Sequence, residues 1–89
     1  MAVVLVQHKV KDFATWKKVF DSALNLRKSS GEISATVYRD ASDPNQLSIV
    51  NHWDSMENAH KFIQSPELRA TMEKAGVEGQ PAVYFLNEE

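Results

Sequence analysis

The sequence predicts one α+β domain of the ferredoxin-like type, in which a four-stranded antiparallel sheet carries its helices on one face. Three observations predict it. Four segments are rich in β-branched or aromatic residues, two longer segments repeat large apolar residues at helical spacing, and their order along the chain is β-α-β-β-α-β. The chain has 89 residues, so we expect residues 1–89 to form a single domain.

The first strand is expected over Val3 to Val10, where the residues are mostly β-branched and apolar. Asp12 is placed to cap a helix from Phe13 to Ser30, because its carboxylate can accept a hydrogen bond from the first helical turn. Large apolar residues recur there at steps of three and four and therefore share one helical face. Gly31 is expected to end this helix.

The next two strands are expected over Ile33 to Arg39 and Leu47 to Trp53, where apolar and polar residues alternate. The segment between them, Asp40 to Asn45, contains an Asp-Pro-Asn sequence that is typical of turns. The two strands are therefore predicted to form a hairpin.

A second helix is expected after Asp54-Ser55, which provides a cap. Ser65-Pro66-Glu67 restarts it, because serine caps a helix, proline fits the first helical position and glutamate suits the first turn. We therefore expect a break or kink at this point. The apolar stripe continues to Gly76, and the last strand is predicted over Gln80 to Leu86.

Helices cover only one face of such a sheet. If the more apolar side packs on them, the two-residue period of strands leaves these residues on the open face: Val3, Leu5, Thr36, Tyr38, Val50, Tyr84 and Leu86. An apolar patch of this extent predicts self-association. A two-fold homodimer with sheet against sheet is the simplest arrangement.

The helix-facing side carries a set of mostly apolar residues: Val4, Val6, His8, Ile33, Ala35, Val37, Arg39, Leu47, Ile49, Asn51, Trp53, Val83 and Phe85. Its polar members lie towards strand ends, where a cleft between sheet and helices can open. The apolar wall of that cleft is expected to comprise Trp16, Phe20 and Phe62. A mostly apolar pocket with a few convergent polar groups is the common form of a small-molecule site.

Each of these residues also has a purely structural interpretation. His8 is either an acid–base group of the pocket or a strand-end histidine bonded to the backbone. Asn51 is either a pocket residue or a satisfied core amide. Trp16 and Trp53 are typical of a core as well as of a ligand platform. Arg39 is typical of a surface charge at a strand end.

Composition argues against several classes of protein. The net charge is −2, and its 12 acidic and 10 basic residues are spread along the chain, which disfavours nucleic-acid binding. The chain has no cysteine, which excludes disulfides and zinc–thiolate sites, and no apolar run long enough to span a membrane. The histidines do not converge, so we expect no metal. We expect a cytoplasmic protein without nucleic-acid or membrane partners.

The segment WDSMENAHKFIQSPELRATM resembles one that recurs in the antibiotic biosynthesis monooxygenase family and related dimeric α+β barrel proteins. Its pattern is a strand ending in tryptophan, an acidic residue and serine, a helix with an aromatic residue, and a serine–proline restart. In this chain those features are Trp53, Asp54, Ser55, Phe62, Ser65 and Pro66. The βαββαβ order extends the resemblance to nearly the whole chain.

The resemblance implies a dimeric α+β barrel with a small-molecule site. The family includes cofactor-independent oxygenases of aromatic polyketides and haem-degrading monooxygenases, and similar barrels serve as polyketide cyclases. Met72 stands where the haem-degrading relatives carry an iron-binding histidine, so we expect no haem and no other cofactor. Polyketide-oxidising relatives hold a phenolic substrate with Asn, Trp, Tyr and Arg residues, for which Asn51, Trp53 and Arg39 are the analogues.

The leading hypothesis is a homodimer whose subunits each bind a small aromatic or hydrophobic molecule, as a cofactor-independent monooxygenase with His8 as the catalytic residue. The expected substrate-binding residues are Trp16, Phe20, Arg39, Asn51, Trp53, Phe62 and Met72. Two alternatives stay open. One is a non-catalytic stress-responsive or accessory protein with the same fold, and the other is an enzyme similar to polyketide cyclases.

Overall fold

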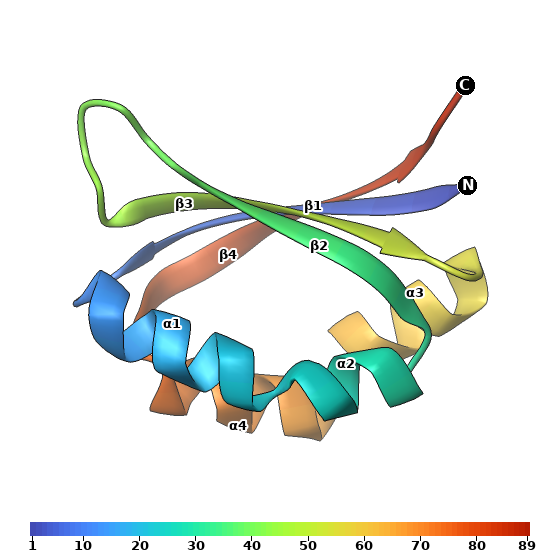
Figure 1. Ribbon diagram of the computed structural model, residues 1–89, viewed down its shortest axis with the longest axis horizontal. Helices are drawn as coiled ribbons and strands as arrows, with labels where there is room; N and C mark the ends of the chain where they lie inside the picture. Colours follow the sequence, from blue (N-terminus) through green and yellow to red (C-terminus); the bar gives the residue numbers. More distant parts are fainter.

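A computed structural model describes residues 1–89 and places all the helices on one face of a single sheet (Figure 1). The elements are β1 (Ala2–Val10), α1 (Phe13–Ser22), α2 (Leu24–Ser29), β2 (Glu32–Arg39), β3 (Gln46–Trp53), α3 (Met56–Ile63), α4 (Pro66–Lys74) and β4 (Val77–Asn87). The strands lie in the order β2-β3-β1-β4, and every neighbouring pair is antiparallel. The predicted ferredoxin-like α+β class is confirmed.

Local sequence features start the helices as predicted. Asp12, Ser55 and Ser65 precede α1, α3 and α4, and each side chain accepts a hydrogen bond from a backbone N–H three residues ahead. Pro66 occupies the first turn of α4, so the second helical segment is broken where the sequence indicates. Gly31 and Gly76 end α2 and α4 with positive φ angles of 115° and 78°.

The helix predicted from Phe13 to Ser30 is divided into α1 and α2, so the prediction of one continuous helix is wrong. Ala23 separates them with φ −89° and ψ 7°, and its N–H contacts the carbonyls of both Val19 and Phe20. The Phe20 carbonyl also accepts a hydrogen bond from Arg27 Nη2 at 2.9 Å. The junction therefore brings the side chain of Arg27 beneath the end of α1.

The prediction that Ile33 faces the helices is also wrong. Glu32 is in register with Trp53 of β3, whereas Ser34 is in register with His52, so Ile33 is the extra residue of a β-bulge. Ile33 is 48% exposed and Glu32 only 6% exposed. Simple alternation along the strand fails at this bulge, and a carboxylate takes the inward position that the sequence pattern assigns to isoleucine.

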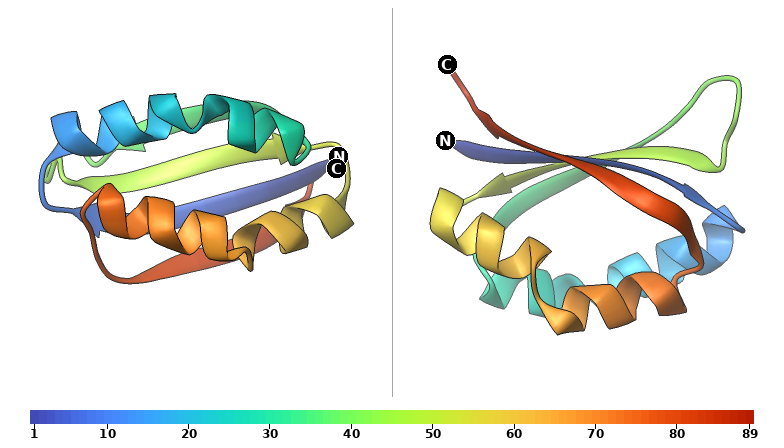
Figure 2. Two further views of the ribbon diagram at one scale, coloured as in Figure 1. Left: turned by 90° about the horizontal axis from the view of Figure 1, so that it is seen from below. Right: turned by 180° about the vertical axis from the view of Figure 1, so that it is seen from behind.

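The core between sheet and helices consists of two hydrophobic clusters. The Trp53 cluster comprises Ala2, Val4, Val6, Trp53, Ala59 and Phe62. The Trp16 cluster comprises Val10, Trp16, Leu47, Ile49 and Ala75. Figure 2 shows α1 and α2 running beside α3 and α4 beneath the same face of the sheet. None of these helices has the length and apolar character needed to cross a membrane.

No element of the chain covers the opposite side of the sheet, which we call the open sheet face (Figure 1). Its apolar centre is formed by residues that the strand register places side by side on β1, β3 and β4: Val3, Leu5, Val50, Tyr84 and Leu86. Tyr84 and Leu86 are 48% and 44% exposed. Tyr38 extends this surface onto β2 and is 57% exposed.

Candidate functional site

A cavity of about 70 Å³ lies between the sheet and the helices, and its lining combines residues of both core clusters. β1 contributes Val6 and His8, and β3 contributes Ile49, Asn51 and Trp53. The helices contribute mainly apolar residues: Trp16, Val19, Phe20, Leu26, Arg27, Phe62, Ile63, Leu68, Thr71 and Met72. The cavity therefore crosses the boundary between the two clusters, where neither packs completely.

All but one of the residues nominated from the sequence line this cavity: His8, Trp16, Phe20, Asn51, Trp53, Phe62 and Met72. The exception is Arg39. This arginine is exposed, its guanidinium lies 3.9 Å from the ring centroid of Phe13, and its Nε donates to the carbonyl of Pro44 at 2.9 Å. Arg39 thus lies at the far end of β2, with its stem packed on an aromatic ring, and outside the cavity.

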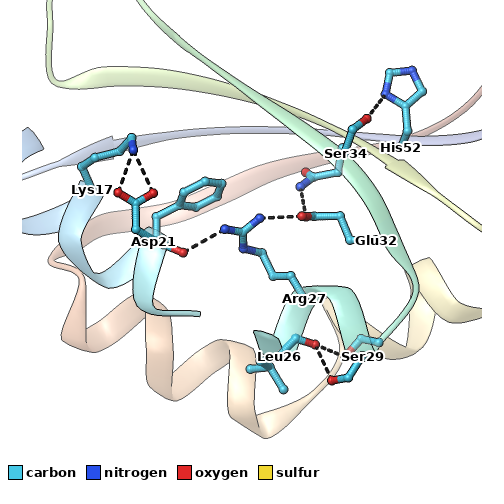
Figure 3. Close-up of polar contacts among 11 residues, drawn as sticks. Lys17, Asp21, Leu26, Arg27, Ser29, Glu32, Ser34 and His52 are labelled. Carbon is cyan, nitrogen blue, oxygen red and sulfur yellow. Dashed lines mark hydrogen bonds and ion pairs between the residues drawn. The ribbon is translucent and has the colours of Figure 1, made fainter. Parts of the chain in front are cut away.

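A buried polar network centred on Arg27 and Glu32 (Figure 3) includes Asn51, and its members Arg27 and Asn51 line the cavity. Arg27 Nη1 lies 2.5 Å from Glu32 Oε1, and Glu32 Oε2 accepts a hydrogen bond from Asn51 Nδ2 at 2.6 Å. The Arg27 guanidinium also lies 3.8 Å from the ring centroid of Phe20. Each of the three polar residues is less than a tenth exposed. The network joins α2, β2 and β3 and carries no net charge.

The sequence interpretation missed Arg27 and Glu32. A detectable sign exists for Arg27, because Trp16, Phe20 and Ala23 lead to position 27 at steps of four, three and four residues along the buried helical stripe. No comparable sign exists for Glu32, which precedes the predicted strand. Its burial depends on a bulge and on partners that come from other elements.

Several buried nitrogen atoms around the cavity have no hydrogen-bond partner in the chain. They are both ring nitrogens of His8, Nε of Arg27 and Nε1 of Trp53. A buried polar group without a partner costs about 1–3 kcal/mol, so such groups are rare unless they serve a purpose. His8 and Trp53 are 5% and 1% exposed, and both line the cavity. Atoms buried this deeply expose almost no surface to the cavity, so a bound polar molecule reaches them only when the surrounding side chains shift.

His8 and Asn51 lie at opposite ends of the cavity. His8 is in register with Leu47, which precedes Asn51 by four residues on β3. At about 3.3 Å per residue this separation is roughly 13 Å along the strand. Val6 and Ile49 fill the inner positions between them and also line the cavity. The site thus has an apolar centre with one polar group at each end.

His8 is held in its neutral form. Its ring packs edge to face against Trp16 with 5.9 Å between ring centroids. Burial lowers the pKa of His8 from 6.5 to about 4. At neutral pH the imidazole is therefore unprotonated but only weakly basic, and its basicity rises when an anion lies beside it.

The buried histidine predicts a pH-dependent stability. The unfolded chain takes up a proton at His8 below about pH 6.5, whereas the folded chain does so only near pH 4. The contribution of neutral His8 is therefore complete above pH 6.5 and is lost as the pH falls towards 4, by up to about 3 kcal/mol. Urea denaturation of the native protein and of His8→Leu measures it. The stability difference between them should change across that window, and a constant difference would contradict the assignment.

The comparisons with known proteins agree with this geometry. The family model for antibiotic biosynthesis monooxygenase matches residues 1–74. SnoaB, a cofactor-independent oxygenase from Streptomyces nogalater, has 12% identity and a TM-score of 0.75 over 99% of this chain and 94% of its own. A conserved protein from Methanosarcina mazei Go1 has 15% identity and a TM-score of 0.76, with coverage of 100% and 94%.

A further crystal structure of an antibiotic biosynthesis monooxygenase has 12% identity and a TM-score of 0.75, with coverage of 100% of this chain and 99% of its own. At such identities the similarity establishes the fold alone. No curated protein resembles the chain closely enough in sequence to count as a match. The family model nevertheless spans most of the 89 residues, and the fold agrees with it throughout. The chain belongs to the antibiotic biosynthesis monooxygenase family.

Proposed function

We propose that the protein binds a small aromatic or hydrophobic molecule in the cavity between sheet and helices and oxidises it as a cofactor-independent monooxygenase. The observation that carries this proposal is the mostly apolar cavity whose buried His8 and Trp53 nitrogens have no partner in the chain. Membership of the family supports it, as does the similarity to SnoaB, which is a cofactor-independent oxygenase.

In this proposal the aromatic walls hold the ring of the substrate, and the polar ends orient its substituents. Trp16 and Phe20 stack with 4.8 Å between ring centroids, whereas the rings of Trp53 and Phe62 are tilted by 39° with their centroids 5.1 Å apart. Asn51 and Trp53 bind a substituent at one end. His8 lies at the other end, where it accepts a proton from the carbon to be oxidised.

The chemistry that fits these groups needs no other reductant. A substrate of the form R₂CH₂ loses a proton to His8, and the carbanion transfers electrons to dioxygen. Loss of water from the peroxide then gives R₂C=O, so that R₂CH₂ and O₂ become R₂C=O and H₂O. The substrate supplies all the electrons. Because buried imidazolium is unfavourable, proton transfer is coupled to formation of the adjacent anion.

The cavity size favours a compact ligand. An apolar cavity of about 150 Å³ holds benzene, whereas this one measures about 70 Å³. A ring therefore enters only when part of the wall moves. No residue of α4 is buried, and its Leu68 and Met72 line the cavity, so α4 is the part of the wall that moves most easily.

We also propose that the protein acts as a homodimer through the open sheet face. The apolar side chains on this face support it, with Tyr38, Tyr84 and Leu86 exposed, because isolated domains of this size rarely leave such a surface uncovered. A dimer of this kind leaves the helices outermost and leaves one cavity in each subunit.

Oxygen uptake with an anthrone substrate, whose ring CH₂ group can be oxidised to C=O, tests the catalytic proposal. We expect His8→Ala to lower kcat at least ~10²-fold while the ligand still binds. His60→Ala is the matched control, since His60 is exposed and stacks on Phe85 outside the cavity. Binding without turnover would indicate the accessory-protein alternative, and turnover without oxygen uptake would indicate a cyclase. Failure of the native protein to bind any such ligand would contradict the proposal.

A further inference from the structure

The buried network fixes the orientation of the Asn51 amide. An ionised carboxylate only accepts hydrogen bonds, and Glu32 Oε2 lies 2.6 Å from the Asn51 side chain. The NH₂ group must therefore face Glu32, which places the amide oxygen Oδ1 on the other side. The amide orientation thus follows from its charged neighbour and is not a free choice between two similar atoms.

Arg27 keeps Glu32 in the state and position that this orientation requires. Its Nη1 lies 2.5 Å from Glu32 Oε1, while its Nη2 donates to the Phe20 carbonyl at 2.9 Å and its plane covers the Phe20 ring. The guanidinium is anchored at three points, and its charge offsets that of the carboxylate. Glu32 therefore remains an acceptor, with its second oxygen directed to Asn51.

Asn51 and Trp53 carry complementary hydrogen-bonding groups on the same side of the cavity. They lie two residues apart on the same face of β3, roughly 7 Å from each other along the strand, and both line the cavity. Asn51 Oδ1 is an acceptor. Trp53 Nε1–H is a donor without a partner in the chain. A hydroxyl group satisfies both, because its O–H donates to Asn51 while its oxygen accepts from Trp53.

We infer that Glu32, held by Arg27, is a positioning residue that turns the Asn51 amide oxygen to the cavity, so that this end selects a ligand hydroxyl over an ether. The inference rests on the proposed function, because it concerns the ligand of the same cavity. An ether oxygen can still accept from Trp53, but it offers no proton to Asn51 and leaves that acceptor unpaired.

Phenol and anisole test the inference, since they differ only in this proton donor and its methyl group. We expect the native protein to bind phenol about tenfold more tightly than anisole, measured by NMR titration of the Trp53 Nε1–H signal. In Glu32→Gln the new amide can donate to Asn51 Oδ1, so the Asn51 amide can turn over and the preference should fall to about one or reverse. Glu57→Gln is the matched control, because Glu57 is exposed and should keep the tenfold ratio.

The native protein provides a test that does not depend on folding of the variant. Phenol should move the ¹³Cγ resonance of Asn51 through a new hydrogen bond to Oδ1, whereas anisole should leave it nearly unchanged. Equal binding of both probes, or equal shifts, would overturn the positioning role while leaving ligand binding in the cavity intact. Binding of neither probe would contradict the proposed function and this inference with it.

Discussion

Glu32→Ala is expected to lower the free energy of unfolding by about 3–5 kcal/mol, because it leaves the buried guanidinium of Arg27 without its charge partner. Arg27 and Glu32 are each 6% exposed, so water cannot replace the missing carboxylate. Asn51 loses its acceptor as well. Domains of this kind have total stabilities of about 5–15 kcal/mol, so the variant should be close to unfolding at room temperature.

Urea denaturation of three variants alongside the native protein separates the cost of an unpaired charge from the loss of a contact. Glu57→Ala removes an exposed carboxylate that pairs with Lys61 at 3.5 Å, and it should change stability by less than about 1 kcal/mol. The double variant Arg27→Met/Glu32→Leu removes both charges and should recover most of the loss, since apolar replacements of a buried pair are often neutral. A Glu32→Ala protein as stable as the native one would show that the pair is not buried in solution.

The fold follows from the sequence because its determinants are local. Asp12, Ser55 and Ser65 cap helices through hydrogen bonds within one turn, and Gly31 and Gly76 adopt the conformations that end them. Each of these features works through residues that are adjacent in the chain. The β-α-β-β-α-β order then leaves few possible topologies.

The errors arise where a buried charge overrides the local pattern. The sequence pattern places Glu32 as a polar residue before a strand. Its hydrogen bonds with Arg27 and Asn51 nevertheless make its burial favourable. The bulge then turns Ile33 outwards. Neither partner is predictable from the sequence around position 32. The helix that the apolar repeat predicts is likewise interrupted near Arg27, whose guanidinium donates a hydrogen bond to the Phe20 carbonyl.

The aromatic members of the site were predictable because a core and an apolar cavity need the same residues. Trp16, Phe20 and Phe62 belong to the helical stripes that face the sheet, whether or not space remains between them. The two-residue period of the strand also predicts that Arg39 faces the helices. In the structure Arg39 is in register with Leu47. The end of β2 carries it beyond the helical layer to Phe13, a displacement that depends on three-dimensional packing.

A charge at the centre of the open sheet face should abolish the proposed dimer. Val50 is in register with Leu5, and Leu5 is in register with Tyr84. The Val50 side chain therefore lies in the middle of the apolar surface. In a two-fold interface each substitution occurs twice, and an unpaired buried charge costs about 2 kcal/mol or more. Val50→Asp should therefore weaken dimerisation at least ~10³-fold.

Sedimentation velocity at micromolar concentration measures this effect. The native protein should sediment as a dimer and Val50→Asp as a folded monomer, whereas Ala70→Asp, which places the same charge on the exposed side of α4, should remain dimeric. A stable interface buries about 1,200–2,000 Å² in total, and aromatic side chains are enriched in it. Tyr38 and Tyr84 supply such side chains on this face. A native monomer would contradict the proposed dimer, and a dimeric Val50→Asp would place the interface elsewhere. Neither result would alter the cavity, because its lining comes from the opposite side of the sheet.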